Sequence, residues 1–364
     1  MKERCSLGNH GGERLRKNVG MKAVRIHEHG GPEALAWEDA PEPGIEANQV
    51  LVRVRACALN HLDLWVRGGI PGMNFAMPHI LGSDIAGEIV EAGGLCRRVR
   101  AGQRVLLAPG LSCRQCPQCV AGRDNFCPEY TLFGLRVPGG NAELVAAPEY
   151  AAIPIPDELG FEEAAAAPLT FLTAWHMLFG RAQLQPGEDV LVLAASSGVG
   201  SAAIQLAKLF QCRVIATAGG QEKLEMARKL GADAVIDHYR QDIAAEVRRI
   251  TDRRGVDVVI EHVGAATWPQ SVQSLATGGR LVTCGATTGY DVKTDLRFLF
   301  SRQHSLLGSF MGSLGELHQV LRFVFRGQVK PVIDRVYPLR EIRAAHERLE
   351  RKEQFGKIVV VPEV

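Results

Sequence analysis

The segment DVLVLAASSGVGSAAIQLAKLF, residues 189–210, joins a short apolar strand to an amphipathic helix through a turn of small residues. Further apolar strands follow at 213–218, 234–237, 256–263 and 279–285. Helical patterns such as 221–231 lie between them. Because near-continuous apolar strands that alternate with helices are typical of a sheet buried on both faces, the pattern predicts a doubly wound parallel sheet.

The turn of this first unit is expected to bind the pyrophosphate of a dinucleotide. Small side chains let the backbone approach phosphate oxygens, and the amino end of the following helix favours negative charge. The spacing departs from G-x-G-x-x-G, since Ala195 and Ser197 stand where the first two glycines belong. A tight structural turn is the alternative, but the place at the head of five strand–helix units favours nucleotide binding. The expected contacts are Ala195, Ser196, Ser197, Gly198, Val199 and Gly200.

The choice between NAD and NADP is predicted from charge. The second strand ends at residues 217–220 without the acidic residue that binds the ribose of NAD. Lys223 follows directly, and Tyr239 and Arg240 follow the third strand. Basic residues accept a 2′-phosphate that an acid would repel, so we expect NADP(H) in preference to NAD(H). Alternatively, Lys223 and Arg240 are ordinary solvated charges. The expected contacts in this part of the chain are Thr217, Lys223, Tyr239, Val263 and Gly285.

The part of the chain before the parallel sheet has a different pattern. Residues 50–59 alternate between apolar and polar side chains, and the strands 84–93 and 103–109 are bounded by Gly or Pro. This pattern predicts an antiparallel or barrel-like β-rich domain. After about residue 305 a helix at 314–327 and a strand at 357–362 are expected to return to it. The predicted boundaries are 21–168 for the β-rich domain, 169–304 for the parallel-sheet domain and 305–364 for the return.

Four cysteines, Cys113, Cys116, Cys119 and Cys127, lie close together in the β-rich part. Two C-x-x-C steps that share a cysteine place three thiols on one loop, and the fourth can complete a tetrahedron around Zn²⁺. A closed site of four thiolates has no open coordination position, so we expect one structural zinc ion in a lobe at about 110–130. Disulfides or four unrelated buried thiols are the alternative.

Composition sets limits on the class of protein. With 364 residues the chain is long enough for two domains, and its net charge of +2 gives no basic field for nucleic acid. No apolar run reaches the length that spans a membrane. Nine cysteines without a signal peptide indicate a reducing compartment, so we expect a cytoplasmic protein. Residues 1–20 contain few large apolar side chains and are expected to be a disordered extension, and a start at Met21 would explain them equally well.

Several segments resemble the medium-chain dehydrogenase/reductase superfamily. They are GSDIAGEIVEAG (82–93), the four-cysteine lobe, AASSGVGSAAIQLAK (194–208), KLGADAVID (229–237) and GKIVVV (356–361). The resemblance covers nearly all of the chain from Met21 onward. It implies an α/β protein with a GroES-like β-rich catalytic domain and a Rossmann domain, and an NAD(P)-dependent oxidoreductase activity.

The resemblance also implies that a catalytic zinc ion is missing. Alcohol dehydrogenases of this superfamily bind that zinc through Cys, His and Cys, and the three positions are Asn60, Ser83 and Leu169 in this chain. These side chains offer neither thiolate nor imidazole. A relocated site built from His61, Asp63, His79 and Asp84 is the alternative. The residues Asn60, Asp63, Gly82, Ser83 and Asp84 instead look like the quinone oxidoreductase and enoyl reductase branch, most of whose members lack the four-cysteine lobe.

A local likeness to crotonyl-CoA carboxylase/reductases covers EHVGAATWPQSV (261–272) and CGATTGYDVKTDLRFLFSRQHSLLGS (284–309). It places His262 at an active-site histidine of that family. A glutamate of that family falls at Arg136, so carboxylation is not expected. The predicted catalytic residues are Asn60, as an oxyanion donor, His262, as a hydrogen-bond or proton donor, and Asp63. His262 could equally be a packed histidine at a strand end, and Trp65 and Phe133 are candidates for the pocket wall.

Together these features predict a cytoplasmic, NADPH-dependent reductase of quinones, conjugated enones or enoyl thioesters. It would carry one structural zinc ion and no catalytic zinc. A zinc-dependent alcohol dehydrogenase with atypical ligands and a non-catalytic nucleotide-binding protein are the two rival hypotheses. The expected partners are a small-molecule substrate and further copies of the chain in a homodimer or homotetramer, and neither nucleic acid nor membrane is expected.

Overall fold

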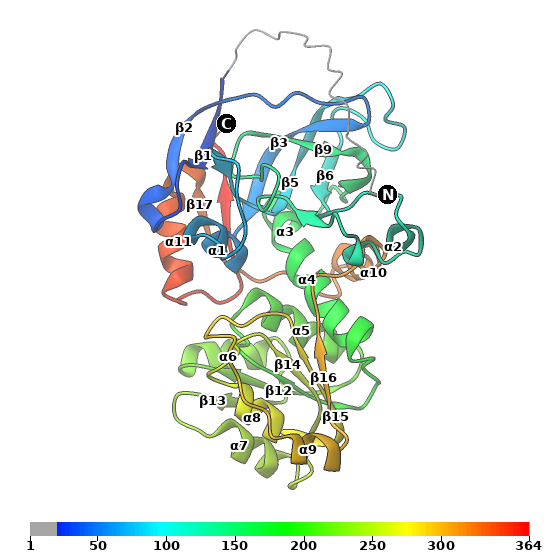
Figure 1. The fold of residues 1–364 in the computed structure, drawn as a ribbon, viewed down its shortest axis with the longest axis vertical. Coiled ribbons are helices and arrows are strands. Elements are labelled where there is room, and N and C mark those ends of the chain that lie inside the picture. Colours follow the sequence, from blue (N-terminus) through cyan, green and yellow to red (C-terminus); the bar gives the residue numbers. More distant parts are fainter. Residues whose placement is uncertain (1–19, 364) are drawn as a thin grey trace, which may run out of the picture.

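The computed structural model describes residues 20–363 and shows two domains, one above the other in Figure 1. The expected disordered extension 1–20 lies outside the described residues except for Gly20, which begins the first strand. The first domain contains the β-rich part of the chain and its last strands, and the second contains the parallel sheet. No helix in the described part of the chain is long and apolar enough to cross a membrane.

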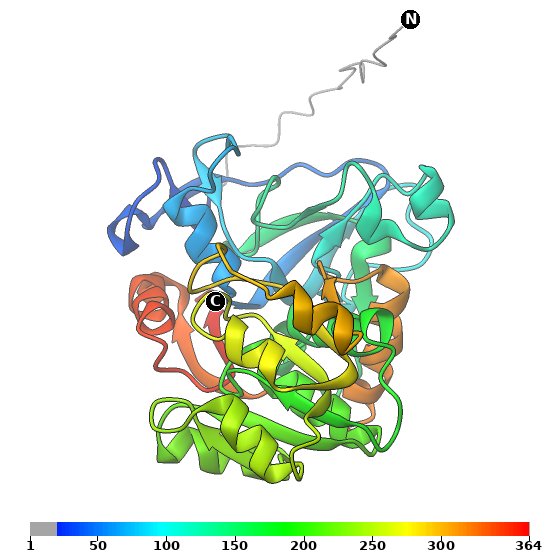
Figure 2. The ribbon, with the colours of Figure 1, turned by 60° about the horizontal axis from the view of Figure 1, so that its bottom comes forward.

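The first domain is built on two sheets. The smaller sheet consists of β2 (Ala36–Pro41), β1 (Gly20–Ile26) and β4 (His79–Ile80), in that order. The larger sheet has the order β10 (Ala152–Pro154), β6 (Arg104–Leu107), β5 (Asp84–Ala92), β3 (Gln49–Ala58), β18 (Lys357–Val361) and β17 (Ile333–Pro338), and β9 (Leu144–Pro148) also pairs with β3. A ribbon of β7 (Gly110–Leu111) and β8 (Thr131–Leu132) borders the cysteine lobe. The helices are α1 (His61–Gly68), α2 (Pro117–Val120), α3 (Phe161–Ala166) and α11 (Ile342–Glu350). The end of the chain, red in Figures 1 and 2, lies in this domain.

The second domain is a six-stranded parallel sheet with flanking helices. The strand order is β13 (Ala234–Asp237), β12 (Arg213–Ala218), β11 (Asp189–Val192), β14 (Val256–Glu261), β15 (Leu275–Thr283) and β16 (Ser305–Gly308). The helices are α5 (Gly198–Leu209), α6 (Gln221–Lys229), α7 (Ile243–Ile250), α8 (Trp268–Gln273) and α9 (Leu296–Ser301). Helices α4 (Pro168–Trp175) and α10 (Leu314–Phe325) lie where the two domains meet (Figure 1). The predicted doubly wound parallel sheet is therefore confirmed.

The central strand of this sheet is buried on both faces. Val190 and Val192 of β11 belong to the large hydrophobic core that the two domains share, whereas Leu191 packs in a second core on the other face. This burial explains why Val190, Leu191 and Val192 are apolar at consecutive positions instead of at every second one.

The predicted boundary at residue 305 is wrong. Residues 305–308 form β16, which pairs in parallel with β15 and completes the second sheet. Helix α10 then packs against α4, and the N–H of Leu314 at its start donates to Asp124 of the cysteine lobe, so the chain returns to the first domain after β16 (Figure 1). Strand β17 was not predicted because its only buried residue is Tyr337, which leaves no apolar alternation to detect.

Candidate active site

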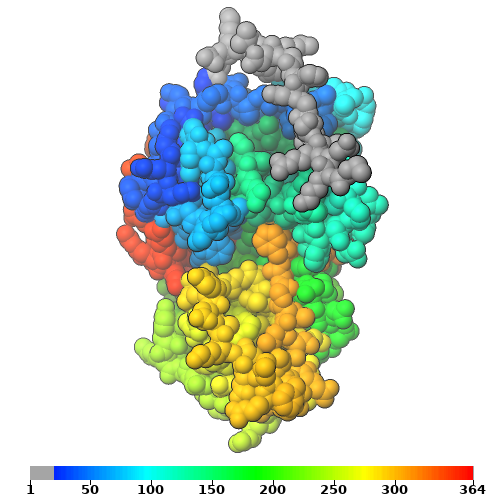
Figure 3. Space-filling view, in the orientation of Figure 1, coloured from blue at the N-terminus to red at the C-terminus, as the bar shows by residue number. Residues whose placement is uncertain are grey.

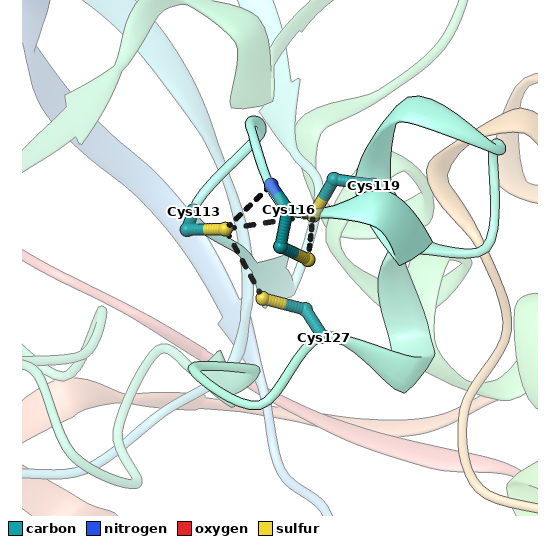
Figure 4. Close-up of side chains that lie close together, drawn as sticks. All are labelled: Cys113, Cys116, Cys119 and Cys127. Atoms are coloured by element: carbon teal, nitrogen blue, oxygen red, sulfur yellow. Dashed lines mark hydrogen bonds between the residues drawn. The ribbon is translucent and has the colours of Figure 1, made fainter. Parts of the chain in front are cut away.

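The four cysteines of the lobe point toward one another, as Figure 4 shows. Their sulfur atoms all lie within 4.8 Å of one another, and the Sγ–Sγ distances include 3.5 Å for Cys113 and Cys127 and 3.6 Å for Cys116 and Cys119. A Zn–S bond of about 2.3 Å in a tetrahedron requires sulfur atoms roughly 3.8 Å apart. All four are free thiols, and backbone N–H groups of Gln115 and Cys116 lower the pKa of Cys113 to about 7. The lobe therefore fits a structural zinc ion.

The turn between β11 and α5 lies at the carboxyl end of its strand. Ser197 caps α5, because its hydroxyl accepts a hydrogen bond of 2.8 Å from the N–H of Gly200. A Cβ atom at Gly200 would collide with the carbonyl oxygen of Ala194, so glycine allows the helix to start close to the strand. The strands β11 and β14 are neighbours although β12 and β13 intervene in sequence. At such a switch point of strand order a parallel sheet opens a crevice for ligands.

The end of β12 supports this turn from the side. Thr217 is fully buried, and its hydroxyl accepts a hydrogen bond of 3.0 Å from the N–H of Ala194. Thr217 therefore holds the turn and has no free surface for the cofactor contact that the sequence suggested. Beyond it, the exposed ring of Tyr239 lies on Gly219, where a Cβ atom would collide with the ring.

Lys223 of α6 lies beside this strand end and reaches the first domain. Its ammonium group donates a hydrogen bond of 2.6 Å to the carbonyl oxygen of Lys352. Burial lowers the pKa of Lys223, and Asp334 opposes this effect. The side chain that was expected at a 2′-phosphate thus also bridges the two domains.

The ring of His262 is turned toward the end of β11 in the parallel sheet. Its Nε2 atom lies 3.1 Å from the carbonyl oxygen of Leu193 and 3.3 Å from the hydroxyl of Ser197. Because a carbonyl can only accept, Nε2 carries the hydrogen in the neutral ring. Burial lowers the pKa of His262, with Glu261 and Leu193 opposing, so the neutral ring is favoured. This geometry argues against the predicted donor role, since the donating nitrogen is already used to hold the turn.

Glu261 organises the residues after β14. This fully buried carboxylate accepts hydrogen bonds from the N–H groups of Val263 and Gly264 and from the hydroxyls of Thr267 and Ser271. It fixes the backbone that carries His262 and Val263 at the carboxyl edge of the sheet. Gly285, after β15, lies next to His262, since a Cβ atom there would be 3.4 Å from its carbonyl oxygen.

The three positions that the resemblance aligned with catalytic zinc ligands, Asn60, Ser83 and Leu169, make hydrogen bonds within the protein. Ser83 is fully buried and donates its hydroxyl to the carbonyl of Phe133 at 2.6 Å, and Leu169 contributes a backbone N–H that binds Asp84 at 2.8 Å. Within residues 20–363, the four cysteines are the one group of three or more His, Cys, Asp or Glu side chains that come together closely enough for a metal ion. The alternative site of His61, Asp63, His79 and Asp84 is therefore not formed.

An ammonium group lies among these positions instead. Nζ of Lys357 donates to Oδ1 of Asn60 at 2.6 Å and to Oδ2 of Asp84 at 2.9 Å. The amide nitrogen of Asn60 donates to the same Asp84 oxygen at 3.0 Å and to the carbonyl of Ala58 at 3.3 Å. Both hydrogens of this amide are thus used, so the predicted oxyanion-donor role of Asn60 requires one of these bonds to be exchanged.

Asp63 fixes the backbone next to this cluster. Its carboxylate accepts hydrogen bonds from the N–H of Asn60 at 2.7 Å and from the N–H of Gly82 at 2.9 Å. Burial raises the pKa of Asp63 to about 6, against these two bonds and the charge of Lys357. Asp63 therefore positions Asn60 and does not itself face a ligand. Of the two aromatic candidates, Phe133 is core, whereas Trp65 of α1 is 44% exposed.

The last strand connects this cluster to the nucleotide turn. The N–H of Gly356 donates to the carbonyl of Ser196 at 2.8 Å. The stem of Lys357 passes the start of α5, because a Cβ atom at Gly198 would be 3.0 Å from its Cδ. Burial, with smaller contributions from His262, Lys352 and Lys357, lowers the pKa of His61 to about 4, so its ring is neutral near pH 7. In Figure 3 the blue and cyan segments of the first domain meet the yellow and orange segments of the second along one line.

Comparisons with known proteins agree with this architecture. Residues 46–157 match the model of the alcohol dehydrogenase GroES-like domain, and residues 198–326 match that of the zinc-binding dehydrogenase family. A crystal structure of an NAD-dependent alcohol dehydrogenase superposes with a TM-score of 0.91 at 45% identity, over 94% of this chain and 99% of that one. The quinone oxidoreductase of Rattus norvegicus is 30% identical over 94% of this chain and 98% of its own length. The crotonyl-CoA carboxylase/reductase of Cereibacter sphaeroides is 31% identical over 91% of this chain and 84% of its own length.

The chain belongs to the medium-chain dehydrogenase/reductase superfamily. It is accordingly an oxidoreductase with a GroES-like domain and a Rossmann domain, as the sequence predicted.

Two residues of the candidate site were not predicted. Lys357 was part of a recognised segment, GKIVVV, but was assigned only to a terminal strand. Its place beside Asn60 depends on a contact across 297 positions of sequence. Glu261 precedes His262 at the end of an apolar strand, and a charged residue at the end of such a strand is the signal that could have identified it.

Proposed function

We propose that this oxidoreductase reduces quinones or conjugated carbonyl compounds, such as enones and enoyl thioesters, with NADPH and without a catalytic zinc ion. The observation that carries the proposal is the cluster of Asn60, Asp84 and Lys357. Asn60, Ser83 and Leu169 offer a carboxamide, a hydroxyl and an apolar side chain, which are poor ligands for Zn²⁺. The ammonium group of Lys357 beside Asn60 would also repel a metal cation.

The chain's own residues are suited to bind the nucleotide and to stabilise negative charge. NADPH, when bound, supplies a hydride to the β-carbon of a conjugated carbonyl or to a quinone. The turn 195–200 would hold the pyrophosphate, with His262 and Glu261 fixing the backbone around it. Lys223 and Tyr239 border the strand end where a 2′-phosphate is expected. Asn60, held by Asp63 and Lys357, would face the carbonyl oxygen on which charge develops.

The test is a turnover screen of the purified full-length protein. NADPH and NADH oxidation would be followed with quinones, enones and enoyl-CoA thioesters, and zinc would be counted by mass spectrometry. We expect one zinc ion per chain and turnover with NADPH that survives a chelator too weak to strip four thiolates. Absence of turnover with all of these acceptors, while NADPH still binds, would indicate a non-catalytic nucleotide-binding protein.

An alcohol dehydrogenase remains the second candidate, because the solved structure at 45% identity has that name. A metal ion assists this reaction by lowering the pKa of a bound alcohol. The two candidates differ in a direct measurement. Two zinc ions per chain together with rapid, chelator-sensitive alcohol oxidation by NAD⁺ would replace our proposal with this one.

A further inference from the structure

Lys357 is a buried cation at the junction of the two domains. Its side chain is 4% exposed, and that of Asp84 is fully buried. The hydrogen bonds to Asn60 and Asp84 use two of the three ammonium hydrogens. Removing two charges from water costs several kcal/mol per ion, and apolar replacements of a buried ion pair are often as stable. Stability alone is therefore a weak reason for an ion pair at this place.

The ammonium group determines how the amide of Asn60 is oriented. Because Nζ of Lys357 can only donate, the Asn60 oxygen must face it and the amide nitrogen must face Asp84 and Ala58. The bond to Ala58, at 3.3 Å, is long for N–H···O. It is the bond that a ligand oxygen could replace at the lowest cost. Without the cation, the Asn60 oxygen would lose its donor, and only the acceptors of Asp84 and Ala58 would still hold the amide nitrogen.

The same lysine also touches the nucleotide side of the junction. Its stem lies against Gly198, and the residue before it, Gly356, binds the carbonyl of Ser196. The positive charge is thus fixed between the phosphate turn of the second domain and the amide of the first. The carboxylate of Asp84 is held in turn by the N–H of Leu169 at the start of α4, so the partner of the lysine is itself fixed.

We propose that the Lys357 ammonium group is the fixed cation of this active site, in place of a metal ion. It orients the Asn60 amide and provides positive charge near the oxygen that becomes negative during reduction. Lys357 is a positioning residue, because it acts on the substrate through Asn60 and through its field. The proposal rests on the proposed function, since it assigns the cation to a reduction that proceeds without catalytic zinc.

The experiment compares Lys357→Met with the double variant Lys357→Met/Asp84→Asn in the full-length protein. Three quantities are measured: Tm, the Kd of NADPH, and the single-turnover rate with the best acceptor of the screen. The single variant leaves Asp84 buried without a partner, so we expect a loss of both Tm and rate. The double variant removes both charges at nearly constant volume. We expect its Tm to return to within a few degrees of the native value while its rate stays at least tenfold below native.

The outcomes show whether the Lys357 charge supports the reaction or only balances the charge of Asp84. If the double variant recovers the native rate together with the native Tm, Lys357 only balances Asp84 and the inference is wrong. Native protein that turns over no acceptor would overturn the proposed function and this inference together. Lys208→Met/Asp233→Asn is the matched control, because this half-exposed pair has a similar Nζ–Oδ2 distance of 2.8 Å and should leave the rate unchanged.

Discussion

Lys223 combines two roles that a substitution can separate. It borders the predicted 2′-phosphate position and also donates to the carbonyl of Lys352. Lys223→Glu places an acid where the 2′-phosphate is expected, so we predict that the Kd of NADPH rises by about tenfold, roughly 1.4 kcal/mol, relative to that of NADH. The measurement is fluorescence titration with both nucleotides. Lys229→Glu, on the exposed end of the same helix, is the control, and an equal loss for both nucleotides would show that Lys223 contributes only to domain contact.

For single residues, the sequence was informative about which residue type stands at a position and not about its hydrogen-bond partners. It predicted a role for Asn60 and the replacement of catalytic zinc ligands, because these predictions depend only on which residue stands at a position. It did not identify Lys357 beside Asn60, nor the carbonyl of Leu193 in front of His262, because hydrogen bonds across domains and strands depend on the packed geometry. The inward orientation of Thr217 also depends on packed geometry, because its hydroxyl accepts a hydrogen bond from the N–H of Ala194 after the neighbouring strand.

We expect the stability of the cysteine lobe to depend on a bound zinc ion. It also contacts the segment that follows β16, since Asp124 accepts a hydrogen bond from the N–H of Leu314 at the start of α10 and Tyr130 packs edge-on against Phe310. We predict that Cys116→Ser lowers the zinc content below one ion per chain. A loss of about 2 kcal/mol or more would lower Tm by roughly 4 °C or more.

The matched control for the lobe is Cys96→Ser, since Cys96 is partly exposed and lies outside it. This variant should keep both zinc and Tm. Purified native protein without any metal and with four reactive thiols in the lobe would contradict the assignment of a structural zinc site.

The strand β18 joins the nucleotide turn through its first residues. Gly356 has a φ of 94°, and a Cβ atom there would collide with the carbonyl of Val332. Gly356→Ala should therefore displace the bond to Ser196, reduce stability by about 1–3 kcal/mol and weaken NADPH binding. Gly278→Ala is the control, because this glycine has a φ of 77° with nothing within 4 Å of the added atom. NADPH affinity that falls equally in both variants would mean that only general strain is measured.

Across the whole molecule, the order of strands and helices in the second domain was predictable and its end was not. Strands 213–218 and 234–237 appear with the predicted bounds. The first is buried at five of its six positions, which explains its continuous apolar pattern. Strand β16 was assigned to the wrong domain since residues 305–308 are only partly buried at the sheet edge. Where an edge strand pairs is decided by the tertiary fold and not by its own composition.

Burial of histidines gives the whole molecule a distinct response to acid. Burial is the leading cause of a lowered pKa at His61, His79, His238, His262, His304, His318 and His346. The value falls to about 4 for His61 and to about 3 for His346, where the Arg67 guanidinium adds to the effect. The unfolded chain binds protons at these rings near pH 6.5, whereas the folded chain does not. Stability from these groups is therefore complete above about pH 6.5 and is lost as the pH falls below it.

We predict that Tm of the protein decreases steadily as the pH falls from 7 to 5, above the range in which ordinary carboxylates titrate. Asp63, with its pKa raised to about 6, opposes this trend with one proton between roughly pH 6 and 4, but several histidines outweigh it. Each net proton taken up on unfolding changes the free energy of unfolding by about 1.4 kcal/mol per pH unit. Thermal scans at constant ionic strength measure this slope. His346→Gln retains an acceptor for Arg67 and should flatten the slope by up to one proton, whereas a native Tm that stays constant from pH 7 to 5 would show that these rings are protonated in the folded chain.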